Sequence, residues 1–285
     1  MFKTGYIFEK FIYRLLVVSG WKRHVVRSNL NFVHSNPSKL TYTKEYKQII
    51  HNLARHVSDI LFDFGSFKKL PPDFSSYPFK QNGITYKFAK GSEPVLNKMR
   101  EGGIFLTAHY GNYEAIGPWL CRLGIPLKAS YIPLKPAALN SIVENRIRSV
   151  DNRNYSVNAK NPREFLRLLD NKNLFCLLMD QDSRIESAAE ATFLKKKVHV
   201  NPLPDFLLRH RPGTPAFICW LEEPKSSKER ILHAIEIEHK SKSTESPIAD
   251  AFNHWLENRI SEDATLWYGW THRRFYSCNP DIYRK

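Results

Sequence analysis

The sequence has few cysteines and no long apolar segment. Its four cysteines, among 285 residues, are far apart and form no Cys-x-x-Cys pair, so neither a disulfide framework nor a metal site is expected. No run of about eighteen apolar residues occurs, so no segment is expected to span a bilayer. A Gly-x-Ser-x-Gly nucleophile elbow is also missing, which argues against a serine acyl-enzyme. Without an RRM or KH signature, nucleic-acid binding is not expected.

What the chain does have is positive charge. Its formal net charge is +15 and its pI is about 9.6, which indicates polyanionic partners such as an anionic membrane, a phosphorylated glycolipid or an acidic carrier protein. Residues 5–18 are apolar but interrupted by Glu9, Lys10 and Arg14, a pattern that favours an amphipathic helix at a membrane interface. A helix packed on the protein is the alternative. Unpaired cysteines in apolar runs favour a reducing, cytoplasm-facing location.

Strand-like and helix-like segments alternate along the rest of the chain. This alternation predicts an α/β fold with a mostly parallel central sheet flanked by helices, after an N-terminal amphipathic helical region. We expect residues 1–70 to form that helical, membrane-proximal region and residues 71–285 the α/β core. The expected strands are 84–88, 104–108, 127–132, 174–179, 216–221 and 231–238. The expected helices are 43–64, 94–100, 137–150, 162–170 and 246–261.

One segment stands out as a candidate active site. Ile104–Ala108 is a continuous apolar run, typical of a buried parallel strand, and it ends at His109. Asn112 is a suitable N-cap for a helix over residues 113–122. His109 is therefore expected at the carboxyl end of a strand, where open α/β sheets place their active sites.

Glu114 lies five residues after His109. With the histidine on a turn and the glutamate in the first helical turn, the carboxylate is expected to reach the imidazole and orient it as a general base. A loop histidine satisfied by hydrogen bonds is the alternative. The same spacing recurs at His233 and Glu238, but residues five apart in a strand point to opposite faces. We therefore interpret the second pair as a chance match.

Four motifs, in order, resemble those of the lipid A biosynthesis acyltransferases, a family within the lysophospholipid acyltransferase superfamily. His109–Glu114 (His-Tyr-Gly-Asn-Tyr-Glu) is similar to the family's His-x4-Asp/Glu box. The others resemble the family's Asp-Gln block at the end of a strand, its carboxyl-terminal Trp-x-Trp-x-His-x-Arg signature, and its Arg-x-Asn-Leu element. They lie in Leu177–Asp182, Leu266–Phe275 and Arg27–Leu30, respectively.

The resemblance implies an enzyme that moves a fatty acyl group from an acyl thioester, in this family acyl-acyl carrier protein, onto a hydroxyl of a lipid A precursor. It implies His109 and Glu114 as the catalytic pair, no cofactor, and a peripheral location on the cytoplasmic face of the bacterial inner membrane. It also implies an anionic membrane lipid as the acceptor. The candidate substrate-binding residues are Arg148, with Arg146 as the second choice, Asp180, Gln181 and Asn112.

Several alternatives stay open. Phe193–Pro202 is basic and lacks the glycine that family members carry here. The alternative acceptors are a phosphatidylinositol mannoside, another glycolipid or an aminolipid. A non-catalytic basic membrane-binding protein is the alternative outside the enzymes. Asp180 and Asp182 either bind the acceptor, order the histidine loop, or cap a turn. The aromatic and basic residues of Trp267–Arg274 are either membrane-interface anchors or core.

Overall fold

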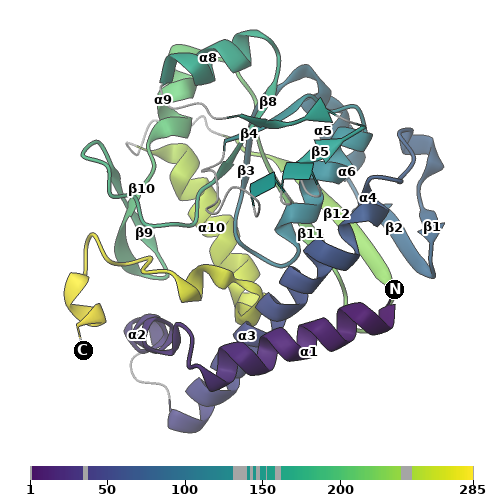
Figure 1. Ribbon diagram of the computed structural model, residues 1–285. Coiled ribbons are helices and arrows are strands. Elements are labelled where there is room, and N and C mark those ends of the chain that lie inside the picture. The colour runs from purple at the N-terminus through teal and green to yellow at the C-terminus, as the bar shows by residue number, and fades with distance from the viewer. Residues whose placement is uncertain are drawn as a thin grey trace.

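The computed structural model describes residues 2–34, 38–130, 140–141, 144–145, 148–151, 153–157, 162–238 and 246–284. It begins with helices: α1 (Phe2–Val18), α2 (Arg23–His34), α3 (Lys39–Phe62) and the short α4 (Phe64–Phe67). α1 lies along α3, at the bottom of Figure 1. None of the helices in the described ranges is both long and apolar enough to cross a membrane.

The central sheet follows. Its strands run in the order β1, β2, β12, β11, β3, β8, β4, β7 (Figure 1). Two of the neighbouring pairs, β1–β2 and β11–β12, are antiparallel, and the others are parallel. The bounds are β1 Phe79–Gln81, β2 Ile84–Phe88, β3 Gly103–Thr107, β4 Leu127–Ser130, β7 Ser156–Val157, β8 Leu174–Leu178, β11 Ala216–Glu222 and β12 Glu229–Glu236. The mixed α/β fold with a mostly parallel sheet is confirmed.

Helices cover both faces of this sheet. α5 (Ser92–Lys98) and α6 (Ile116–Arg122) pack on one face with α4. α8 (Pro162–Asp170), α9 (Leu203–His210) and α10 (Pro247–Glu262) pack on the other, together with α2 and much of α3. Two small antiparallel pairs lie outside the sheet: β5 (Ser149–Val150) with β6 (Arg153–Asn154), and β9 (Ala189–Phe193) with β10 (Lys196–Val200). Six short 3-10 turns occur in the described ranges: η1 Phe74–Ser76, η2 Met99–Glu101, η3 Tyr113–Ala115, η4 Ala264–Leu266, η5 Tyr268–Thr271 and η6 Pro280–Tyr283.

The central strand β3 is buried along its whole length. Ile104 and Leu106 pack into the core on one face, and Phe105 into the core on the other. A strand that is covered on both faces needs apolar residues at every position, which explains the continuous run in the sequence. The strand enters between its neighbours at Gly103, where a Cβ would lie 2.6 Å from the carbonyl oxygen of Pro215.

The expected helices near 43–64, 94–100, 162–170 and 246–261 are confirmed to within four residues at their ends, as are the six expected strands. The predicted helix 137–150 lies largely outside the described residues. Its end was wrong, because Ser149 and Val150 form β5. The β9–β10 hairpin was not predicted. Lys195 lies at its turn with a positive φ of 60°.

A buried arginine joins the N-terminal helices to the sheet. Arg230 of β12, with a side chain only 8% exposed, donates to Glu223 from Nε (2.9 Å) and to the Tyr86 hydroxyl from Nη1 (2.8 Å). Its Nη2 donates to Asp63, which follows α3. Burial alone lowers the pKa of this guanidinium, but Glu223 and Asp63 raise it above its ordinary value. The group therefore stays charged and is balanced by two carboxylates.

We predict that Arg230→Ala lowers the free energy of unfolding by about 3–5 kcal/mol, because it leaves the carboxylates of Asp63 and Glu223 without their buried partner. Denaturant unfolding followed by circular dichroism measures this loss. Arg284→Ala is the matched control, since the Arg284–Asp281 pair is exposed and such pairs contribute little. Equal, small effects of the two substitutions would contradict a structural role for Arg230.

Candidate active site

The parallel register of β3 and β8 decides which side chains meet at the carboxyl end of the sheet. Thr107 lies opposite Leu178, and the amide of Met179 donates to the Thr107 carbonyl (3.1 Å). Two residues further along each chain, the same register brings His109 beside Asp180. Asp180 is thus placed by sheet pairing rather than by nearness in sequence to the histidine box.

The Asp180 carboxylate accepts three N–H groups. Its Oδ1 is 2.8 Å from His109 Nδ1, and its Oδ2 accepts the His109 backbone N–H (3.0 Å) and the indole N–H of Trp267 (2.9 Å). Because a carboxylate only accepts hydrogen bonds, Nδ1 carries a proton and Nε2 of the neutral ring has a free lone pair. The Asp180 side chain is fully buried, whereas 16% of the His109 side chain is exposed.

The two groups shift each other's pKa in opposite directions. Burial lowers the pKa of His109, but the charge and hydrogen bond of Asp180, with a smaller contribution from Glu114, raise it above its ordinary value of 6.5. Burial raises the pKa of Asp180, but His109 and the indole of Trp267 lower it to about 2. Asp180 therefore remains ionised at neutral pH and stabilises the protonated imidazole.

Glu114 lies in η3, half-buried, as expected for the first helical turn after the loop. Its charge acts on His109, but the hydrogen bond to the ring nitrogen is made by Asp180, so the expected orienting contact belongs to a different carboxylate. Burial raises the pKa of Glu114, while Arg148 and His109 lower it. Glu114, Arg148 and His109 thus form a compact group of interacting charges.

The other predicted site residues do not all lie beside His109. Asn112 precedes the turn as expected, but its side chain makes no capping bond and its Nδ2 donates to Glu223 (3.4 Å). Gln181 is exposed on the loop after Asp180, and Arg146 lies outside the described residues. His233 of β12 donates from Nε2 to Glu222 of the neighbouring strand β11 (2.7 Å), a different carboxylate from the Glu238 that matches it in sequence spacing.

The carboxyl-terminal segment also contributes to the site. This contribution was not predicted from the sequence. The backbone N–H of Tyr268 donates to the His109 carbonyl (2.8 Å), and Tyr110 forms a β-bridge with Trp267. The His272 ring lies 5.8 Å from that of His109, between centroids. The Tyr113 ring meets the His109 ring edge-on, with 5.0 Å between their centroids. The signal for this arrangement was the Trp and His of the carboxyl-terminal signature.

Trp267, Trp270 and Arg274 are buried rather than anchored in a membrane interface, so the core interpretation of these residues is correct. Trp267 packs directly on Gly269, where a Cβ would lie 2.0 Å from the indole Cε2. The glycine thus allows the indole to lie close to the backbone and reach Asp180. His272 and Arg273 of the same segment are exposed.

Behind the histidine loop, residues 108–112 between β3 and η3, lies a buried part of α3. The ring of His56 lies 4.8 Å from that of Tyr113 and 5.5 Å from that of Tyr268. Burial, with the charge of nearby His109, lowers the pKa of His56 to about 3, so its imidazole is neutral at physiological pH.

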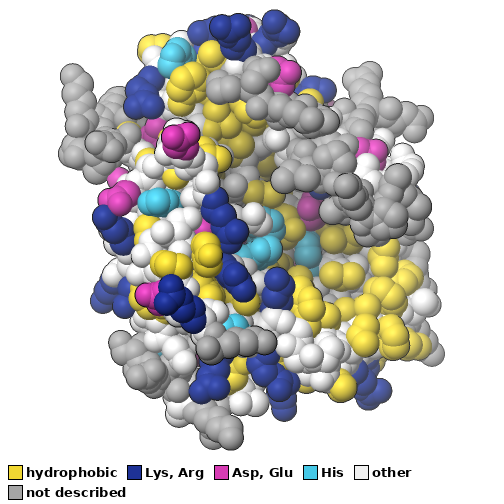
Figure 2. Space-filling view, turned by 60° about the vertical axis from the view of Figure 1, so that its left-hand side comes forward, with side chains coloured by type: hydrophobic (Ala, Val, Ile, Leu, Met, Phe, Trp, Pro, Cys, Tyr) yellow, Lys and Arg dark blue, Asp and Glu magenta, His cyan; other side chains and the backbone are white. Residues whose placement is uncertain are grey.

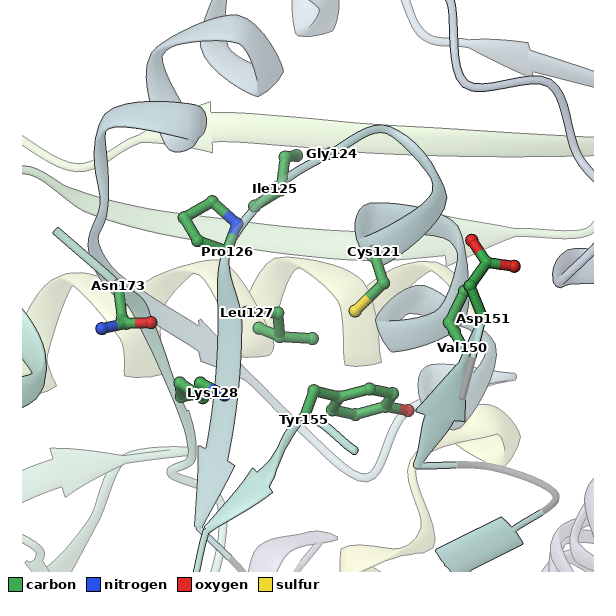
Figure 3. Close-up of a pocket in the computed structure, with 10 residues that line it drawn as sticks. All are labelled: Cys121, Gly124, Ile125, Pro126, Leu127, Lys128, Val150, Asp151, Tyr155 and Asn173. Carbon is green, nitrogen blue, oxygen red and sulfur yellow. The ribbon is translucent and has the colours of Figure 1, made fainter. Parts of the chain in front are cut away.

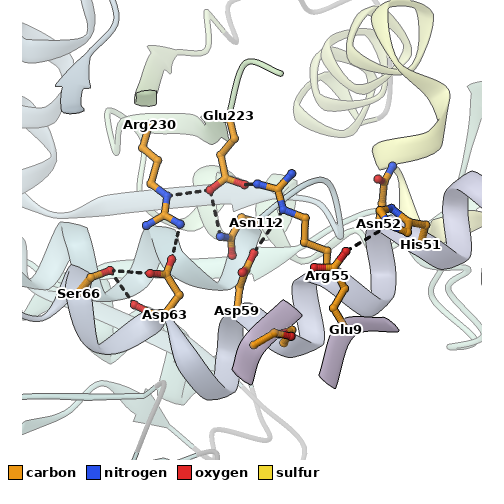
Figure 4. Close-up of polar contacts among 12 residues, drawn as sticks. Glu9, His51, Asn52, Arg55, Asp59, Asp63, Ser66, Asn112, Glu223 and Arg230 are labelled. Carbon is orange, nitrogen blue, oxygen red and sulfur yellow. Dashed lines mark hydrogen bonds and ion pairs between the residues drawn. The ribbon is translucent and has the colours of Figure 1, made fainter. Parts of the chain in front are cut away.

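Beside His56, Asn112 joins the charged network of Figure 4 through Glu223. Arg230 and Arg55 of this network both pair with Glu223, so the loop is supported from α3 and from the sheet.

Histidine side chains lie in the middle of the face shown in Figure 2, among Lys and Arg side chains and beside a hydrophobic area. A separate cavity of about 480 Å³ includes Leu127, Tyr155 and Asn173 in its lining (Figure 3). Leu127 begins β4 and Asn173 precedes β8, so this cavity lies at the amino ends of the strands, opposite His109. Within the described ranges, no three His, Cys, Asp or Glu side chains are grouped as metal ligands would be.

The chain was also compared with models of known protein families. The model of the family described as bacterial lipid A biosynthesis acyltransferase matches residues 9–277. The chain belongs to this family, and the family indicates an acyltransferase. A search of curated proteins gives no match.

We predict that Asp180→Asn lowers the pKa of His109 below 6.5. The substitution keeps the buried position that disfavours the imidazolium but removes the negative charge that favours it. Glu114→Gln should lower the same pKa less, because Glu114 is the weaker contributor. Titration of the His109 ring by NMR measures both shifts. A His109 pKa that is unchanged in Asp180→Asn would contradict the assigned pair.

We also predict a pH-dependent stability that His56 controls. Its folded-state pKa of about 3 is below the ordinary 6.5, so between these values the unfolded chain binds the additional proton and stability falls as pH falls. From pH 6.5 to pH 4.5 this amounts to about 2–3 kcal/mol. Denaturant unfolding of His56→Phe across this range should lack that part of the slope. Parallel curves for the two proteins would contradict it.

Proposed function

We propose that this protein transfers a fatty acyl group from the thioester of acyl-acyl carrier protein to a hydroxyl of a lipid A precursor, with His109 as general base. The observation that carries the proposal is the partly exposed His109, held by the buried Asp180, in a chain that belongs to an acyltransferase family. Such a pair activates a substrate hydroxyl without a protein nucleophile.

The path of the transferred proton follows from the tautomer of His109. With its Nδ1 proton bound to Asp180, His109 accepts the acceptor's hydroxyl proton at Nε2. The hydroxyl oxygen attacks the thioester carbon, and the carbonyl becomes a tetrahedral oxyanion. When the C–S bond breaks, the carrier's thiolate leaves and takes the proton from the imidazolium. Asp180 stabilises the positive ring between these two transfers, as the carboxylate of a catalytic triad does.

The second part of the proposal concerns Glu114 and Arg148. The negative charge of Glu114 favours the imidazolium, and we assign Arg148, whose charge acts on Glu114, to the phosphate of the acceptor or the oxyanion. Guanidinium groups suit both tasks because they offer several N–H donors in a fixed plane.

The partners follow from charge and from the family. A net charge of +15 attracts an acidic acyl carrier protein and an anionic membrane lipid, since opposite charges increase the rate of encounter. We place the reaction at the cytoplasmic face of the bacterial inner membrane, where a carrier protein and a lipid acceptor meet. The protein acts there as a peripheral O-acyltransferase.

We predict that His109→Ala lowers turnover by about two to four orders of magnitude, because it removes the general base. Glu114→Gln keeps the shape but loses the charge, and should also lower the rate strongly. The assay follows a labelled acyl group from acyl carrier protein to a purified lipid A precursor, with circular dichroism as the test of folding.

His233→Ala is the matched control, because His233 also pairs with a glutamate but lies on β12. Its turnover should stay close to that of the wild type. Near-normal transfer by a folded His109→Ala protein would rule out the proposed mechanism. Transfer to a different glycolipid or aminolipid, with the lipid A precursor inactive, would correct the acceptor and keep the mechanism.

A further inference from the structure

Helix α1 is fixed to the protein along one side. The hydroxyl of Ser58 on α3 donates to the Gly5 carbonyl (2.8 Å), and Glu9 pairs with His51 of α3 (3.2 Å). Aromatic contacts add to this, since the ring of Phe8 lies 5.6 Å from that of Phe62. The helix is thus held by α3 with a defined side turned outward.

The outward side is apolar. Ile7, Phe11, Leu15 and Val18 are 68%, 60%, 54% and 86% exposed, and their spacing of four, four and three residues places them in one stripe along the helix. Tyr6, 55% exposed, lies beside this stripe. The other large exposed hydrophobic side chains in the described ranges are Leu178, Ile185 and Ile235, and they belong to separate elements.

The charges on this side are of one sign. Lys10 and Arg14 are exposed next to the stripe, and the Lys10 ammonium lies 4.1 Å from the centre of the Tyr6 ring. The single acidic residue of α1, Glu9, is turned inward to His51. Two copies docked through this side would bring like charges together, whereas an anionic lipid surface offers both an apolar layer and phosphate groups.

We propose that α1 lies flat in the headgroup region of an anionic bilayer, with Ile7, Phe11, Leu15 and Val18 inserted and with Lys10 and Arg14 at the lipid phosphates. A helix of 17 residues is about 25 Å long, so it presents the stripe along the membrane plane.

This docking adds a mode of membrane binding to the proposed function. It rests on the proposed function only in taking the acceptor to be a membrane lipid. α3, which holds α1, also carries His56 behind the histidine loop. A bilayer bound to α1 would therefore lie against the helical layer that supports the loop of His109.

The test is sedimentation with vesicles of phosphatidylglycerol and phosphatidylethanolamine, compared with neutral phosphatidylcholine vesicles. Wild-type protein should bind the anionic vesicles, and high salt should release much of it. Phe11→Ser combined with Leu15→Ser should weaken binding to both vesicle types by about tenfold or more. Lys10→Gln combined with Arg14→Gln should weaken binding to anionic vesicles alone, by about tenfold.

The matched control is Ile185→Ser combined with Ile235→Ser, which removes two exposed hydrophobic side chains outside α1 and should bind as the wild type does. Circular dichroism confirms that each variant folds. Wild-type protein that does not bind vesicles, or unchanged binding by the α1 serine variant, would overturn the proposal. So would a wild-type dimer in analytical ultracentrifugation that this variant dissociates, since the stripe would then be a protein interface.

Vesicle binding is measured without any acyl transfer. A protein that binds vesicles through α1 but transfers no acyl group would therefore contradict the proposed function and leave the docking intact. A protein that transfers an acyl group to a detergent-dispersed acceptor but does not bind vesicles would contradict the docking and leave the proposed function intact.

Discussion

The Asp180 carboxylate is fully buried, so its negative charge has to be balanced by groups inside the protein. Those groups come from two places that are far apart in the sequence: His109 after β3, and Trp267 in the carboxyl-terminal segment. The same hydrogen bonds that compensate the charge fix the histidine's tautomer and orientation. Folding and chemistry thus depend on one set of contacts, and breaking it affects both.

Support for this carboxylate extends to the amino-terminal helices. Asn52 of α3 donates to the Thr265 carbonyl (3.0 Å), and Asn29 of α2 donates to the carbonyls of Trp270 (2.9 Å) and His272 (2.8 Å). These bonds hold the segment that carries the indole at Asp180. The helices that join α1 to the protein therefore also hold the site in shape, which links the proposed membrane docking to the position of the catalytic base.

The sequence predicted the sheet because β3 and β8 are covered on both faces and need continuous apolar runs. It placed His109 at a strand end for the same reason. It assigned the orienting carboxylate to Glu114, because a local pattern reveals partners only a few residues apart. Asp180 meets His109 through strand register, and Trp267 through the path of the carboxyl-terminal segment. Such long-range contacts follow from the assembled fold. The motifs had marked Asp180 as a candidate substrate-binding residue, but Trp267 only as part of a signature whose residues were either membrane anchors or core.

The central claim is that Asp180 acts through His109, and a double-mutant cycle on kcat/KM tests it most directly. His109→Ala, Asp180→Ala and the double variant are compared in the acyl-transfer assay, with unfolding curves to confirm that each protein folds. If the two side chains act as a unit, their effects are strongly non-additive. We predict that the double variant is no slower than His109→Ala alone. Losses that multiply in the double variant would contradict the account, because Asp180 would then act independently of the histidine.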